Sequence, residues 1–218
     1  MTGLYIIPNW FFSYDIALNI IFAVITLAVS IYALKIYKLS FQRQSKLFGL
    51  SFLSISFSYI LKSLFISILL LKLHYQKVIS LLTFNIWTDL ALYTHIFFFI
   101  LGLVTLAYMT FSVKNFRVYS SIFLLSVFPF LLTNYKTHMF HILSALLLIY
   151  IFYHYFKNSL NNKSLWNIAV MAAFGLLFLS NIGFLLAINY NFYYVFGDLI
   201  NLLAYILVLT NLLLVARK

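Results

Sequence analysis

The chain has 218 residues, of which 65% are hydrophobic and only 8% are charged, and its mean hydropathy is +1.06. Soluble domains carry about 25% charged residues, so this composition excludes a water-soluble globular protein and indicates one that lies in a lipid bilayer. The net charge of +11 comes from scattered single residues, which argues against a nucleic-acid-binding segment, and the lack of cysteine excludes disulfides and thiolate metal sites.

The hydrophobic residues fall into long runs, and a helix needs about 20 of them to cross the hydrocarbon core. The first run follows a tail without a basic residue and is too long for a signal-peptide core, so we expect it to be retained. The fourth run is the shortest and contains Pro129; without it the chain would have six spans. The sequence predicts an all-α, single-domain bundle of seven transmembrane helices, over 11–34, 47–71, 90–113, 119–135, 140–156, 166–188 and 198–216.

The basic residues alternate between the gaps and orient the predicted spans. Ten of the fourteen lie in the first, third and fifth gaps and at the C-terminus: Lys35, Lys38, Arg43, Lys46, Lys114, Arg117, Lys157, Lys163, Arg217 and Lys218. The opposite side holds Lys72, Lys77 and Lys136. Because short loops rich in Lys and Arg stay in the cytoplasm, we expect the N-terminus outside, the C-terminus inside, and a multi-pass protein of the cell membrane.

Ionisable residues inside the spans are the best functional candidates, because such residues usually face the bundle interior or a cavity. The chain has three acidic residues, Asp15, Asp89 and Asp198, and the predicted orientation puts each at the outer end of a span. Lys62 lies in the outer half of the second span. The alternative is structural: Lys62 pairs with one Asp, and the others cap helices or lie in solvent.

Helical spacing adds polar neighbours to these charges. Asn19 lies four residues after Asp15, with Thr26 and Ser30 on the same stripe, and Asn201 and Tyr205 share a face with Asp198. Serines at 51, 54 and 58 share a stripe with Lys62. These stripes predict a polar seam between helices; they are also compatible with small, hydroxylated residues that only permit close packing. The predicted ligand-binding residues are Asp15, Asn19, Lys62, Asp89, Asp198, Asn201 and Tyr205.

Other chemistry has weaker support. His95 and His141 lie at similar predicted depth, so a single haem between them is conceivable, but packed, hydrogen-bonded histidines explain them more simply. We expect no cofactor and no metal. The chain has no phosphate loop, metalloprotease helix or nucleophile elbow, so we do not expect an enzyme.

The stretch 194–205, Tyr-Val-Phe-Gly-Asp-Leu-Ile-Asn-Leu-Leu-Ala-Tyr, runs into a Leu-rich helix that ends Val-Ala-Arg-Lys. It resembles the last span of the seven-helix input modules of prokaryotic sensor proteins, and of small stand-alone archaeal seven-span membrane proteins. The resemblance implies a sensor-like layout and transfers no functional residue. The small sugar transporters of the SWEET type share the predicted topology. They carry hinge prolines, whereas this chain has only Pro8 and Pro129 and no Pro-Gln pair.

Three functional hypotheses follow. The first is a sensor- or receptor-like module that binds a small apolar or cationic ligand in the outer half and signals to a protein partner at the basic cytoplasmic loops. The second is a small transporter in which Asp and Lys couple a solute to an ion. The third is a structural subunit of a membrane complex. Each has the lipid bilayer as its surroundings, and none involves nucleic acid.

Overall fold

The computed structural model describes residues 9–76, 81–111, 115–133, 135–161, 164–187 and 190–216. Two predicted span ends, at 113 and 188, lie outside the described residues, as do Lys77, Lys114, Lys163, Arg217 and Lys218.

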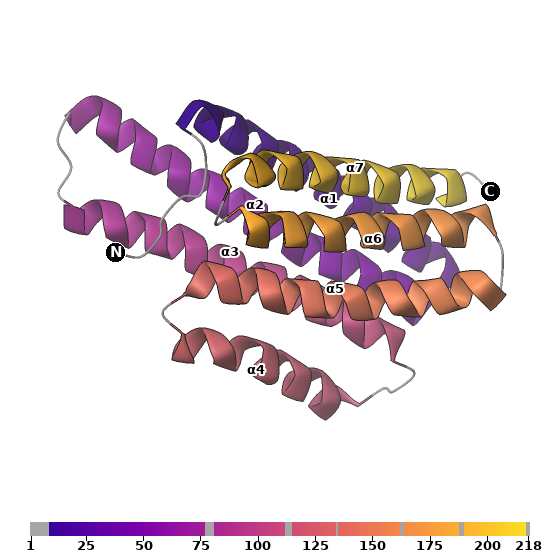
Figure 1. Ribbon diagram of the computed structural model, residues 1–218. Helices are drawn as coiled ribbons and strands as arrows, with labels where there is room; N and C mark the ends of the chain where they lie inside the picture. Colours follow the sequence, from indigo (N-terminus) through magenta and orange to yellow (C-terminus); the bar gives the residue numbers. More distant parts are fainter. Residues whose placement is uncertain are drawn as a thin grey trace.

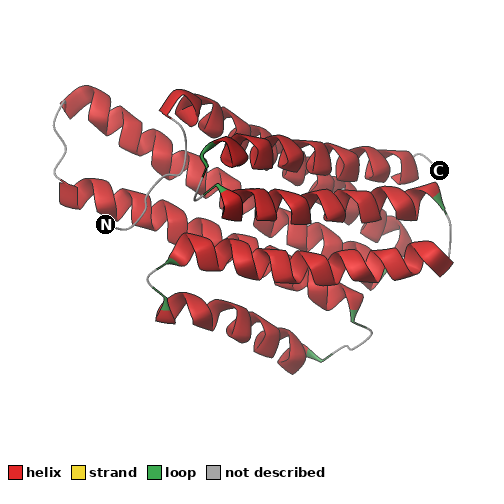
Figure 2. Ribbon diagram, in the orientation of Figure 1, coloured by secondary structure: helices red, strands yellow, loops and turns green. Residues whose placement is uncertain are grey.

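All the regular secondary structure of the described chain is helical (Figure 2), which confirms the predicted all-α class. A short 3-10 turn, Asn9–Phe11, leads into the first helix. The helices are α1 (Phe12–Ser40), α2 (Arg43–Gln76), α3 (Leu81–Thr110), α4 (Phe116–Leu132), α5 (Lys136–Asn161), α6 (Leu165–Leu186) and α7 (Phe192–Ala216).

Local signals set several helix ends. The side chains of Asn115 and Ser164 accept hydrogen bonds from the backbone N–H groups of Arg117 and Asn167, at 2.9 and 3.3 Å, and so cap the starts of α4 and α6. α1 ends where Phe41 takes a left-handed conformation (φ 53°) and donates its N–H to the carbonyl of Tyr37.

Six helices form a closed ring, in which α1, α2, α3, α5, α6 and α7 each pack against the next and α7 returns to α1. α4 packs outside this ring against α3 and α5 (Figure 1). The ring encloses a core of large apolar side chains, fully buried and contributed by several helices: Phe22, Phe52, Ile55, Ile100, Leu103, Leu148, Ile151 and Phe174.

All six helices of the ring are long and apolar enough to cross a membrane, which indicates a multi-pass membrane protein. α4 has 17 residues and is about 25 Å long, whereas the hydrocarbon core is about 30 Å thick. Among the described residues, six helices are therefore of spanning length, and the fourth predicted span, 119–135, coincides with this shorter, peripheral helix.

α2 and α3 extend well past their predicted spans of 47–71 and 90–113 at the end where they join. α2 has 34 residues, about 51 Å, and α3 begins at Leu81. The α2–α3 hairpin projects beyond the neighbouring helices (Figure 1). Hydropathy locates the part of a helix that suits lipid, not the residue at which the helix ends.

Small and hydroxylated residues let the ring helices approach closely. A Cβ atom on Gly102 of α3 would lie 2.7 Å from the backbone oxygen of Ser51 on α2. Ser30 and Ser56 donate hydrogen bonds of 2.8 Å to the carbonyls of Gly49 and Ala23, and so join α1 to α2. Both hydroxyls serve helix packing; Ser30 belongs to the predicted stripe of the first span, whereas Ser56 lies off the stripe of the second.

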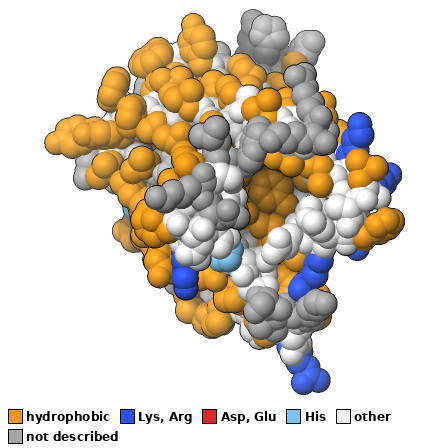
Figure 3. Space-filling view, turned by 90° about the vertical axis from the view of Figure 1, so that its right-hand side faces the viewer, with side chains coloured by type: hydrophobic (Ala, Val, Ile, Leu, Met, Phe, Trp, Pro, Cys, Tyr) orange, Lys and Arg blue, Asp and Glu red, His pale blue; other side chains and the backbone are white. Residues whose placement is uncertain are grey.

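Exposed basic residues gather at one end of the bundle. Exposed Lys38, Lys46, Arg117 and Lys157 lie where α1 ends, α2 and α4 begin and α5 ends, and we call this the basic end. Figure 3 shows Lys and Arg side chains around this end, with a hollow that has an apolar floor.

Candidate functional site

A buried polar cluster joins α1 to α2 in the half of the bundle away from the basic end. Asp15 and Asn19 on α1 are only 1% and 2% exposed. The Asn19 amide nitrogen donates to the backbone oxygen of Asp15 at 2.7 Å, which fixes the orientation of the amide. Its oxygen then accepts a hydrogen bond of 3.2 Å from Nζ of half-buried Lys62. In the described part of the chain, this ammonium therefore bonds an amide and not a carboxylate.

α7 completes the cluster. The Tyr194 hydroxyl donates to Oδ1 of Asp15 at 2.8 Å. Asp198 is buried one helical turn further along α7 and interacts electrostatically with both Asp15 and Lys62. We call Asp15 and Asp198 the acid pair.

Within the part of the chain that the structure describes, each member of the acid pair has one oxygen without a hydrogen-bond partner. These atoms are Oδ2 of Asp15 and Oδ2 of Asp198, and both are fully buried. Buried polar atoms in proteins are nearly always paired, and a buried carboxylate oxygen without a partner is especially costly. With both carboxyl groups ionised, the acid pair would carry one negative charge more than the Lys62 ammonium neutralises. The arrangement is therefore suited to a small cation or to a donor group.

A pair of tyrosines lies between the acid pair and the basic end of the bundle. The hydroxyls of Tyr59 on α2 and Tyr205 on α7 are 3.0 Å apart, and both side chains are buried. Phe22 packs against both rings, at centroid distances of 5.3 and 5.6 Å. Tyr205 is seven residues after Asp198, about 10 Å along α7. This aromatic layer separates the acid pair from the basic end.

Two histidines extend the polar interior toward α3 and α5. His95 packs against Tyr59 and Phe140, interacts electrostatically with Lys62 and His141, and keeps a buried Nδ1 without a partner. The Nδ1 of His141 lies 3.3 Å from the amide oxygen of Asn181. Among the residues that the structure describes, no group of three His, Cys, Asp or Glu could hold a metal ion.

The structure thus brings together four of the seven predicted site residues: Asp15, Asn19, Lys62 and Asp198. Asn201 and Tyr205 are buried on the same helix as Asp198. Asp89 does not join them, because its side chain is exposed on α3.

Two residues of this polar interior, Tyr194 and Tyr59, were not predicted. Tyr194 falls in the aromatic run 190–196, a pattern typical of a membrane-boundary belt. Nothing in that pattern distinguishes Tyr194, which contacts Asp15, from the other aromatic residues of the run. Tyr59 lies three residues before Lys62 and therefore on the same helix face, a signal that could have identified it.

A second feature lies at the basic end, where a cavity of about 300 Å³ opens between the ring helices. Its lining includes Phe48 of α2 and Val208 and Asn211 of α7. Asn211 is thirteen residues after Asp198, about 20 Å along the helix, so this cavity is distinct from the acid pair.

Against known proteins, the chain matches no protein-family model, no curated protein and no solved structure.

Proposed function

We propose that the protein is a receptor-like membrane module that binds a small cation between Asp15 and Asp198. The observation that carries this proposal is the acid pair itself, two buried carboxylates on α1 and α7, each with an unpartnered oxygen. Intramembrane charge of this kind is costly and marks ligand or ion sites more often than structural ones. A bound cation would supply the missing partner of these oxygens and stabilise the ionised form of both carboxyl groups.

The contacts of the acid pair suggest how binding is transmitted. Tyr194 and Asp15 connect α7 to α1, and the Lys62–Asn19 bond connects α1 to α2. A cation at the acid pair competes electrostatically with the Lys62 ammonium and shifts α2 relative to α1. α2 begins at the basic end with Arg43, where a cytoplasmic protein partner would detect the shift.

The proposal includes the orientation of the protein in the membrane. Seven spans, with α4 as the fourth, put the acid pair in the outer half and the basic end in the cytoplasm of a cell-membrane protein. Short basic gaps support this orientation. α4 would cross as a short helix, with the bilayer locally thinned around it.

Thermal unfolding in lipid nanodiscs tests the cation site. Wild-type protein is compared in N-methylglucamine chloride, sodium chloride and benzamidinium chloride at equal ionic strength. A ligand present at about 100 times its Kd stabilises the folded state by about 2.7 kcal/mol. We expect sodium or benzamidinium to raise Tm, and Asp15→Asn or Asp198→Asn to abolish the rise.

Asp89→Asn is the matched control, because it removes one exposed carboxylate and should keep the full response. If neither cation raises the wild-type Tm, or if the rise survives in the Asp15→Asn/Asp198→Asn variant, the proposed cation site is wrong.

A transporter is the second candidate, and the cavity at the basic end favours it. This cavity and the acid pair lie in one ring, on either side of the Tyr59–Tyr205 layer. That arrangement is what an inward-facing state of an ion-coupled carrier requires. Sodium uptake into proteoliposomes that is lost in Lys62→Met and Asp198→Asn would favour the carrier over the receptor.

A further inference from the structure

The cavity at the basic end differs from the acid pair in its chemistry. Its lining comes from all six ring helices, without an acidic, lysine or arginine side chain among the described residues. The apolar part includes Phe48, Met109, Val170, Val208 and Leu212. The volume of about 300 Å³ is at the lower limit of small-molecule pockets, about 300–1,000 Å³.

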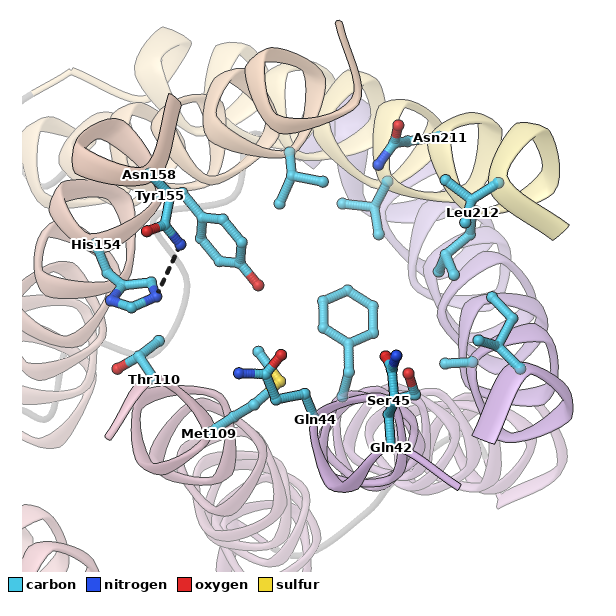
Figure 4. Close-up of a pocket in the computed structure, with 16 residues that line it drawn as sticks. Gln42, Gln44, Ser45, Met109, Thr110, His154, Tyr155, Asn158, Asn211 and Leu212 are labelled. Carbon is cyan, nitrogen blue, oxygen red and sulfur yellow. Dashed lines mark hydrogen bonds between the residues drawn. The ribbon is translucent and has the colours of Figure 1, made fainter. Parts of the chain in front are cut away.

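Asn211 is the most informative residue of this cavity. Its side chain is only 8% exposed, and its buried Oδ1 has no hydrogen-bond partner among the residues that the structure describes. Figure 4 shows the amide reaching toward the cavity from α7. A leucine would fill the same space without an unpaired amide, so the asparagine lowers stability unless something in the cavity bonds it.

Further polar groups face the same space. In Figure 4 the Tyr155 hydroxyl points into the cavity from α5, and the Gln44 amide reaches it from α2. The ring of Tyr155 stacks on buried Phe174 with centroids 5.2 Å apart, which fixes where the hydroxyl points. His154 and Asn158 bond each other at 3.2 Å at the edge of the cavity. The polar groups therefore stand on opposite walls around an apolar body.

From this geometry we infer a second binding site, for a small uncharged molecule with an apolar ring and one amide or carbonyl group. The amide of Asn211 can donate to and accept from that group, while Tyr155 bonds it from the facing wall. The apolar side chains hold the ring. Because the lining offers no counter-ion and the surrounding end of the molecule is basic, an organic cation is disfavoured.

Benzamide and benzamidinium are matched probes for this site, since they share a shape and differ in charge. Binding is measured by saturation-transfer NMR with the full chain in nanodiscs, and empty nanodiscs report partition into lipid. We expect saturable benzamide binding to the wild type. Asn211→Leu removes two hydrogen bonds and should raise the Kd of benzamide about tenfold, and Tyr155→Phe should raise that Kd about fivefold. Thr210→Leu, an exposed neighbour on α7, is the control and should bind as the wild type does.

Stability provides a second measurement on the same variants. Asn211→Leu should keep or raise Tm, because it removes an unpaired buried amide, so its loss of binding is not a loss of fold. Protection from chemical labelling is a third measurement, because the chain has no cysteine of its own. Benzamide should slow the reaction of a maleimide with Gln44→Cys at the cavity, whereas benzamidinium should not.

Two results would overturn the inference: no saturable benzamide binding to the wild type, or equal affinity in the wild type and Asn211→Leu. Neither result concerns the acid pair, which is tested with other variants and whose expected ligands are cations and not benzamide. The two proposals can therefore fail separately.

Discussion

The hydroxyl of Tyr194 donates a 2.8 Å hydrogen bond to Oδ1 of Asp15, and so connects the start of α7 to the start of α1 across 179 residues of sequence. The contact lies where the helix ring closes, since α7 is the last helix and packs back on the first. It satisfies one oxygen of a buried carboxylate and leaves the other open.

Tyr194→Phe should lower the free energy of unfolding by about 1.5–3 kcal/mol, because it leaves a buried carboxylate oxygen without its donor. For a chain of this size, that corresponds to a fall in Tm of about 3–12 °C. Tyr193→Phe, at an exposed position, is the control and should leave Tm unchanged. An unchanged Tm in Tyr194→Phe would mean that the bond contributes nothing to stability.

Lys62→Met should destabilise the protein by about 1–3 kcal/mol, because it removes positive charge next to two buried carboxylates. Adding Asp198→Asn should recover part of the loss, since the second change removes one of the uncompensated charges. Thermal unfolding of the two single variants and the double variant measures this coupling. Strict additivity would show that Lys62 and Asp198 do not interact, and Lys157→Met at the surface controls for loss of positive charge alone.

Gly102→Ala should destabilise the α2–α3 contact by about 1–3 kcal/mol. Its Cβ would meet the backbone oxygen of Ser51 at 2.7 Å, and backbone cannot move aside as a side chain can. At Gly175 a Cβ would meet only the ring of Phe152, at 3.1 Å. Gly175→Ala should therefore cost less, and equal falls in Tm would contradict the close approach.

The absence of cysteine makes the topology testable by single-cysteine labelling. Exposed positions 10 and 135 should react with a membrane-impermeant maleimide from outside intact cells, whereas positions 44 and 116 should react only after lysis. Positions 116 and 135 flank α4 and report whether it crosses. If Phe116→Cys and Tyr135→Cys react from the same side, α4 does not span the bilayer and the seven-span topology is wrong.

The amino-acid sequence by itself determined the all-α class, the membrane setting and the approximate position of each helix. These follow from hydropathy, which depends on local composition alone. It also pointed to Asp15, Asn19, Lys62 and Asp198, because a charge in an apolar run is costly wherever its partner lies.

Only the tertiary structure decided which of these residues meet. All three aspartates look alike in sequence, yet Asp15 and Asp198 share the interior where α7 closes on α1, while Asp89 faces outward on the α2–α3 hairpin. The Tyr194–Asp15 bond and the cavity around Asn211 depend on side chains from helices far apart in the chain. The periodicity within one helix does not tell which other helix its side chains will contact. Hydropathy gives the depth of a residue in the bilayer, whereas its partners are set by the packing order of the helices and by their rotation about their axes.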